Sequence, residues 1–159
     1  MKKAAEKTNV MRILDQYKVE YISHTYDGTG EMTGVDIAEV LGEDPDQVFK
    51  TLVTVGRSGQ NYVFVVPVKK ELDLKKAAAA VKEKSIEMVK SKELLPLTGY
   101  IHGGCSPVGM KKFFTTTFDS QAEIPEKVMF SAGRIGFQVE LKLDDLRKVI
   151  PFAVADICE

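Results

Sequence analysis

Apolar and polar residues recur along the chain with two different periods, which predict short helices mixed with strands. A first helix is expected in KTNVMRILDQYKV, where Val10, Ile13 and Leu14 fall on one face. The segment EYISHTY that follows alternates like a strand. A second helix, TGVDIAEVLG, is expected to begin at a capping Thr33 and to end at Gly42. The pattern therefore predicts helix, strand and helix at the start of the chain.

Two β-rich runs follow, QVFKTLVTV and NYVFVVPV, and the short glycine-containing link GRSGQ between them predicts a hairpin. Lys50 stands among the apolar residues of the first run. A charged amine inside a core strand is costly unless it is paired or neutralised. Its side chain either reaches solvent or points into a concave site, where it holds an anion or a polarised carbonyl. Alternation along the strand leaves both interpretations open.

The second half of the chain continues the mixture of helices and strands. Asp73 is placed to cap the short helix LKKAAAAVK, and SKELLPL begins as a helix that should deform at Pro96. SIEMV, FFTTTFD and FQVELKL are strand-like, and DDLRKVI is expected as a last helix that ends at Pro151. We therefore expect one α/β (α+β) domain over residues 1–159, built on a mixed sheet. The glycine motif of a Rossmann domain is missing after the first strand.

Composition narrows the class of protein but does not identify a function. The chain has 159 residues, of which 44% are hydrophobic and 28% charged, as in an ordinary globular protein. It has no apolar run long enough to span a bilayer and no signal-peptide pattern at its start, so we expect a cytoplasmic protein without membrane contact. The net charge of −1 means that nucleic acid could bind only to a local patch, for which the lysine-rich residues 69–92 are a candidate. A solvated helical face is the simpler interpretation of these lysines.

Residues that could carry chemistry gather in glycine-rich loops. GGCSPVG, which begins at Gly103, could present backbone amides to a carboxylate, a phosphate or an oxyanion, although most such loops are only turns. Cys105 has no histidine at a recognisable spacing to activate it, and Ser106 lacks a GxSxG elbow. The chain has two histidines and no CxxC motif, so we expect no metal site and no cofactor. His24 and His102 are expected to make local hydrogen bonds.

Taken together and in order, five segments resemble the YbaK/EbsC family of aminoacyl-tRNA deacylases, which is related to the editing domain of bacterial prolyl-tRNA synthetase. They are HTYD, LGEDPDQVFKTLV, LDLKKAAAAV, TGYIHGGCSPVGMKK and SAGRIGFQVEL. The resemblance extends from about Val10 to Ile157 and is strongest to the Cys-tRNA(Pro) deacylase branch. It implies a mixed, barrel-like sheet flanked by short helices, with one pocket for the aminoacyl end of a tRNA.

The resemblance also assigns site residues. The lysine and threonine of the family motif match Lys50 and Thr51, and the tyrosine that ends the family's first strand matches Tyr26. The family's GxxxP loop begins at Gly103 and closes at Pro107. By this resemblance Lys50 contacts the terminal nucleotide or phosphate, and Gly103 offers backbone groups near the reacting carbonyl. Thr51 and Tyr26 would shape the pocket and donate hydrogen bonds.

Other pocket positions follow the family less closely. Ser106 is a further candidate donor to the substrate. Thr33 stands where better-known members have an aromatic residue, and Gln138 stands where an aspartate is often seen. Both departures concern which amino acid of an aminoacyl-tRNA the pocket accepts.

The chemistry implied by the family needs no catalytic cysteine, histidine or metal in the protein. The thiol of a cysteine wrongly attached to tRNA(Pro), or of Cys-tRNA(Cys), attacks its own ester carbonyl, and a cyclic thioester leaves. The family also implies a transient complex with prolyl-tRNA synthetase, while the oligomeric state stays undetermined. Three alternatives remain open: a deacylase for another small amino acid such as Ala-tRNA(Pro) that uses water, a non-catalytic regulatory or interaction protein on the same fold, and a module that binds a small molecule.

Overall fold

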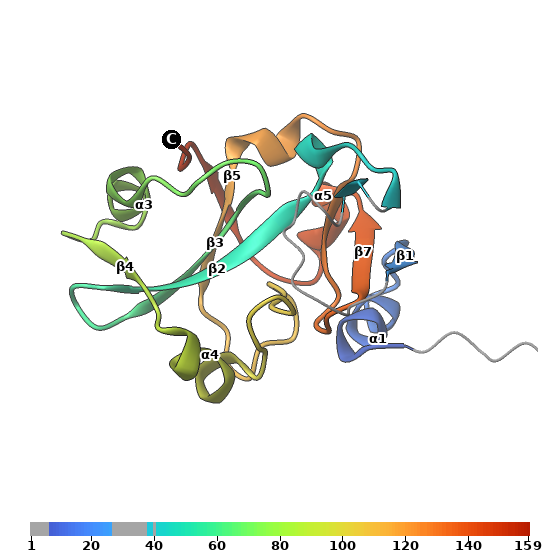
Figure 1. Cartoon of the computed structure of the whole chain (residues 1–159), viewed down its shortest axis with the longest axis horizontal. Helices are drawn as coiled ribbons and strands as arrows, with labels where there is room; N and C mark the ends of the chain where they lie inside the picture. The colour runs from blue at the N-terminus through green and yellow to red at the C-terminus, as the bar shows by residue number, and fades with distance from the viewer. Residues whose placement is uncertain (1–6, 27–37, 40) are drawn as a thin grey trace, which may run out of the picture.

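The computed structural model describes residues 7–26, 38–39 and 41–159, which form short helices and strands in mixed order (Figure 1). In chain order these are α1 (Asn9–Gln16), β1 (Ile22–Thr25), the 3₁₀ turn η1 (Pro45–Gln47), β2 (Phe49–Gly56), β3 (Asn61–Pro67), α3 (Leu74–Val81), β4 (Ile86–Met88), α4 (Ser91–Thr98), β5 (Thr115–Asp119), the 3₁₀ turn η2 (Ser120–Glu123), β6 (Val128–Ser131), β7 (Phe137–Leu141), α5 (Leu143–Leu146) and β8 (Ala153–Ala155).

The strands form two sheets, a five-stranded sheet in the order β4-β2-β3-β5-β8 and a three-stranded sheet in the order β1-β7-β6. In the larger sheet β2 pairs antiparallel with β3, whereas β5 pairs parallel with both β3 and β8. The two sheets meet where Val48 and Met129 form a parallel bridge. The predicted mixed α+β fold and the β2–β3 hairpin are confirmed. In the part of the chain that the structure describes, the strands do not close into a barrel.

The main hydrophobic core lies between these sheets and α1. Val10, Met11 and Leu14 are the buried residues of α1, and the helix begins at Thr8, whose side chain accepts a hydrogen bond from the backbone N–H of Met11. A second cluster lies between β3 and α3, where Phe64 and Ala77 are among the fully buried members. The helix predicted around Val10 and Leu14 is therefore confirmed, and it presents its apolar face to the core.

Several predicted elements differ from the structure. α4 continues through Pro96 and ends at Gly99, so the proline does not interrupt it. The last helix is much shorter than expected, because α5 stops at Leu146 and turns follow up to Pro151. The strands β6 and β8 were not predicted, since each is too short to show a clear alternation.

The predicted second helix lies mostly outside the described residues, as does its expected cap Thr33, although Ala38, Glu39 and Leu41 are helical. Within the described residues, the helices are too short and too polar to cross a membrane.

Candidate functional site

Lys50 lies on β2 opposite Val66 of β3, and its side chain is only partly exposed. Its Nζ lies 3.4 Å from Oε1 of Glu71, and the two side chains are 30% and 76% exposed. An ion pair this exposed contributes only about 0–1 kcal/mol to stability. Glu71 therefore holds the ammonium group loosely, and an anionic ligand could replace this carboxylate at little cost.

β6 and β7 carry further polar residues of the candidate site. The parallel bridge between Val48 and Met129 joins β2 to β6. Lys50 and Ser131 each lie two residues beyond these partners, so each shares a face of its own strand with the bridge residue. Ser131 is paired directly with Gln138 of β7, so these two side chains also share a face. The candidate site thus draws on three neighbouring strands, with Lys50 on β2, Ser131 on β6 and Gln138 on β7.

Two polar atoms on these strands have no hydrogen-bond partner. They are Oε1 of Gln138 and Oγ1 of Thr51. Among the described residues, these are the two buried side-chain nitrogen or oxygen atoms without a hydrogen-bond partner. Leaving such an atom unpaired costs about 1–3 kcal/mol, and native structures rarely leave one. Both atoms are therefore suited to hydrogen-bond a bound molecule.

Thr51 does not point in the same direction as Lys50, although the two are neighbours in sequence. Alternation along β2 places Thr51 on the face of Phe49 and Val53, which belong to the main core. In the register set by Val48 and Met129, it lies alongside the end of β6. The site residues predicted from sequence therefore do not all lie on one face of β2.

Tyr26 and Gly103 both approach the turn that joins β6 to β7. The backbone N–H of Tyr26 donates to the carbonyl of Gly136 at 2.9 Å, which extends the β1–β7 ladder by one residue. Gly103 is exposed and has φ +89°, and a Cβ atom on it would lie 3.6 Å from Cγ1 of Ile135. The loop that begins at Gly103 therefore lies against this turn, next to the strand ends that carry Ser131 and Gln138.

Ser106 and Pro107 are buried beneath the surface of this loop. The Oγ atom of Ser106 accepts a hydrogen bond from the backbone N–H of Val108 at 3.3 Å, and the hydroxyl of Tyr100 donates to the carbonyl of Val108. These bonds hold the loop in shape. Direct contact of Ser106 or Pro107 with a substrate stays a prediction, as does the pocket role of Thr33, which lies outside the described residues.

Cys105 is a buried free cysteine in the same loop. Burial raises the pKa of its thiol to about 12, so almost none of it is thiolate near neutral pH. Because the thiolate is the nucleophile, this cysteine is poorly suited to attack a substrate. The structure thus agrees with the expectation that Cys105 is not activated.

His24 makes a side-chain hydrogen bond, as expected, but with a partner that is distant in sequence. Its Nε2 lies 2.7 Å from Oε1 of Glu140 and 3.9 Å from Oε1 of Glu43. Among the described residues, these three form the one group that could offer three ligand atoms to a metal ion. However, the second oxygen of Glu140 accepts a hydrogen bond from the side chain of Gln47 at 2.8 Å. Hydrogen bonding between β1, β7 and η1 accounts for the cluster without an ion.

Sequence reasoning missed Ser131 as a site residue, because no motif marks it and the strand that carries it is only four residues long. The only signal available was the short apolar run Val128–Phe130 just before it. It also missed the partner of His24, since Glu140 is far away in sequence and only the pairing of β1 with β7 brings the two together.

The fold agrees with what comparison with known proteins shows. The chain belongs to the family of aminoacyl-tRNA editing domains, whose model matches residues 30–149. It is 44% identical over 141 residues to a protein of Enterococcus faecalis (strain ATCC 700802 / V583) that is named as a Cys-tRNA(Pro)/Cys-tRNA(Cys) deacylase, EbsC. That match covers 88% of this chain and 86% of the relative. The family resemblance seen in the sequence is confirmed.

Solved structures give the same fold. A protein described as a trans-editing enzyme for prolyl tRNA synthetase is similar with a TM-score of 0.82 and 25% identity, over 97% of this chain and 99% of that one. The hypothetical protein APE2540 is similar with a TM-score of 0.85 and 23% identity, over 94% of this chain and 99% of that one. The latter similarity concerns the fold alone.

Proposed function

We propose that the protein is a trans-editing aminoacyl-tRNA deacylase that removes cysteine from Cys-tRNA(Pro) and from Cys-tRNA(Cys). Family membership and the 44% identical relative support this substrate class. The structural observation that carries the proposal is the loosely paired ammonium group of Lys50, on a strand that β6 joins to β7 and to the unpartnered amide oxygen of Gln138. A positive charge and an unused hydrogen-bond acceptor on neighbouring strands suit a substrate that combines phosphate with polar ribose and amino groups.

In the proposed reaction the substrate supplies its own nucleophile. The sulfur of the attached cysteine bonds to the ester carbonyl carbon, and the bond from that carbon to the ribose oxygen breaks. The thiol proton ends on the ribose hydroxyl, and the cyclic thioester that leaves later takes up water to give free cysteine. The protein contributes position and charge stabilisation, which are large effects when the reacting groups are held in place.

Within this reaction each site residue has a proposed task. Lys50 binds the terminal phosphate or ribose and so fixes the ester. Gly103 brings exposed backbone close to the carbonyl at a point where a side chain would intrude. Gln138, Thr51 and Tyr26 bind polar groups of the aminoacyl end. Neither Cys105 nor His24 takes part, because the thiol is buried and the imidazole is engaged by Glu140.

We further propose that the protein acts in the cytoplasm and in transient complex with prolyl-tRNA synthetase. The chain has a net charge of −1, and two lysines of the 69–92 segment are already paired, Lys69 with Asp46 and Lys76 with Asp156. Such a surface offers little general attraction to tRNA. A synthetase that holds the tRNA would supply the affinity that this surface lacks.

A substrate panel tests the proposed activity. tRNA(Pro) is charged with cysteine, serine, alanine or proline, and tRNA(Cys) with cysteine, and release of the amino acid is measured. We expect release of cysteine from both tRNAs and none of serine, which has nearly the same shape but lacks the thiol. Release of alanine or serine at the rate of cysteine would instead indicate hydrolysis by water, and no release from any substrate would indicate a non-catalytic binding protein.

A further inference from the structure

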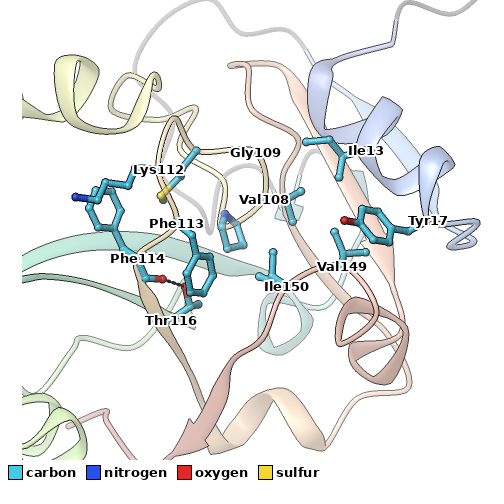
Figure 2. A pocket seen from close by; sticks show the side chains of 12 residues that line it. Ile13, Tyr17, Val108, Gly109, Lys112, Phe113, Phe114, Thr116, Val149 and Ile150 are labelled. Carbon is cyan, nitrogen blue, oxygen red and sulfur yellow. Dashed lines mark hydrogen bonds between the residues drawn. The ribbon is translucent and has the colours of Figure 1, made fainter.

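A hollow away from the Lys50 site opens between α1 and the segment that follows the glycine-rich loop (Figure 2). Ile13 of α1 and Tyr17, the residue that caps its C-terminus, form one side of it. Val149 and Ile150 lie between, and the other side is formed by Lys112, Phe113, Phe114 and Thr116. Its volume is about 200 Å³, below the roughly 300–1,000 Å³ of pockets that hold drug-sized ligands. A single flat ring system therefore suits it better than a larger molecule.

The rim of the hollow carries exposed aromatic rings. Tyr17 is 51% exposed and Phe113 is 52% exposed, although both are large and partly apolar. Exposed aromatic side chains at the edge of an apolar hollow are suited to stack against a base, which every nucleotide can offer. The aromatic content thus favours a planar ligand over an aliphatic one.

The rim also carries positive charge that the fold leaves unused. Lys112 lines the hollow and makes no ion pair within the described part of the chain. In contrast, Lys50, Lys69 and Lys76 each have a carboxylate partner there. A free ammonium group beside an aromatic surface complements a base with its phosphate, which is how proteins bind single-stranded nucleic acid.

The hollow is connected to the candidate site by one loop. Gly103 lies at the site end of this loop, while Pro107, Val108 and Gly109 line the hollow. The backbone from Gly103 to Pro107 can span at most roughly 14 Å. A chain of unpaired nucleotides on the order of a few residues long could therefore follow the loop from the site to the hollow.

We propose that this hollow binds a base of the unpaired 3′ end of the tRNA, just before the terminal adenosine, with Lys112 on the adjoining phosphate. The inference rests on the proposed deacylase function, and it explains how a nearly neutral protein selects a tRNA end. Tyr17 and Phe113 stack on the base, and Lys112 lies outside the reaction itself.

The direct test is a titration that needs no turnover. RNA acceptor-stem hairpins with and without the unpaired CCA end, neither carrying an amino acid, are added to the full-length protein while the aromatic NMR signals of Tyr17 and Phe113 are followed. We expect both signals to shift with the CCA hairpin and to stay unchanged with the truncated one. Equal shifts with both hairpins, or none with either, would overturn the inference.

Variants connect this binding to the reaction. Phe113→Leu and, separately, Tyr17→Leu keep apolar bulk but remove the ring, and we expect roughly tenfold weaker binding of the CCA hairpin and a similar rise in KM, with kcat unchanged. Lys112→Ala should also reduce the slope of log Kd against log salt by about 0.7. Two variants away from the hollow's lining serve as controls. Ile124→Ala truncates an exposed apolar side chain that follows η2, and Lys142→Ala removes an exposed lysine outside the 69–92 segment.

The outcomes separate this inference from the proposed function. If the wild-type protein releases cysteine but the ring variants match it in both binding and KM, the hollow is not a base site and the deacylase proposal stands. If the CCA hairpin shifts the signals but no substrate is cleaved, the binding inference holds and the catalytic proposal fails. Added prolyl-tRNA synthetase is expected to increase the activity of the wild type. If Phe113→Leu differs from the wild type only in lacking this increase, the hollow binds protein and the inference is overturned.

Discussion

Thr51 and Gln138 carry buried oxygen atoms that the fold itself does not use. Removing a hydroxyl that has no partner should not weaken the fold, because no hydrogen bond is lost. We therefore expect Thr51→Val to leave the free energy of unfolding unchanged or slightly higher and to lower kcat/KM for deacylation. Urea denaturation and a deacylation assay measure the two quantities.

Thr54 offers a matched control on the same strand. It is also buried, but its Oγ1 donates to the carbonyl of Tyr62 at 2.9 Å. Thr54→Val should therefore destabilise the protein by about 1 kcal/mol and leave the activity of the folded enzyme intact. If Thr51→Val destabilised the protein as much as Thr54→Val and kept full activity, the hydroxyl of Thr51 would be structural.

Substitution of Gly103 should affect stability, because its φ is positive, and activity, because it lies in the candidate site. Gly59, in the turn between β2 and β3, has nearly the same φ, +91° against +89°, and a Cβ on it would meet nothing within 4 Å. We expect Gly103→Ala and Gly59→Ala to destabilise the protein by a similar amount, on the order of 1 kcal/mol. Only Gly103→Ala should reduce deacylation, measured well below the unfolding temperature of both variants. Equal activity of the two would mean that the backbone at Gly103 is not part of the site.

Among single residues, Lys50 and Gly103 could be identified from the sequence only through a family resemblance. Alternation alone left open whether the Lys50 side chain reaches solvent or points into a concave site, and the structure pairs its amine with the carboxylate of Glu71. The unpartnered atoms of Thr51 and Gln138 could not have been predicted, since they depend on which neighbours fail to reach them.

Helices and strands could be predicted from the sequence where they are long or begin at a capping residue. The β2–β3 hairpin and the Asp73 cap of α3 follow from residue types close together in sequence, and Asp73 does accept from the N–H groups of Lys75 and Lys76. Local pattern could not reveal β6, whose four residues are held by β7 and by the bridge to β2. The candidate site includes Ser131 of β6, so a strand that local pattern could not predict contributes to it.

The loop between α4 and β5 should make the fold sensitive to alkaline pH. Burial raises the pKa of Cys105 from 9.0 to about 12 and that of Tyr100 from 10.0 to about 12. As pH rises above about 9, the unfolded chain loses these protons first, which favours unfolding. We therefore expect stability to be complete below pH 9 and to fall between about pH 9 and 12.

Urea denaturation at several pH values measures this loss. Cys105→Ala removes one of the titrating groups, so its stability should fall less steeply with pH than that of the wild type. A stability that stays constant up to pH 12 in the wild type would contradict the burial of these groups.

The whole molecule combines a family fold with a nearly neutral charge. Its mixed fold class was predictable from the order of helices and strands, while the division into two sheets that meet at one bridge was not, because it depends on long-range pairing. With a net charge of −1, the protein should bind bare tRNA(Pro) weakly and with strong dependence on salt. Fluorescence anisotropy at physiological salt should give a Kd in the micromolar range or above, and prolyl-tRNA synthetase should tighten it. Nanomolar binding to bare tRNA would contradict this account.

The most direct test of the central claim is the rate of cysteine release from Cys-tRNA(Pro) by Lys50→Ala. Loss of a hydrogen bond from a charged group costs about 1.5–3 kcal/mol, so kcat/KM should fall by roughly 10- to 100-fold while the fold remains intact. Lys76→Ala is the matched control, because Lys76 is also a partly exposed lysine in an ion pair, with Asp156 as its partner. It should retain the wild-type rate. Full activity in Lys50→Ala would contradict the assignment of this lysine to the aminoacyl-tRNA site.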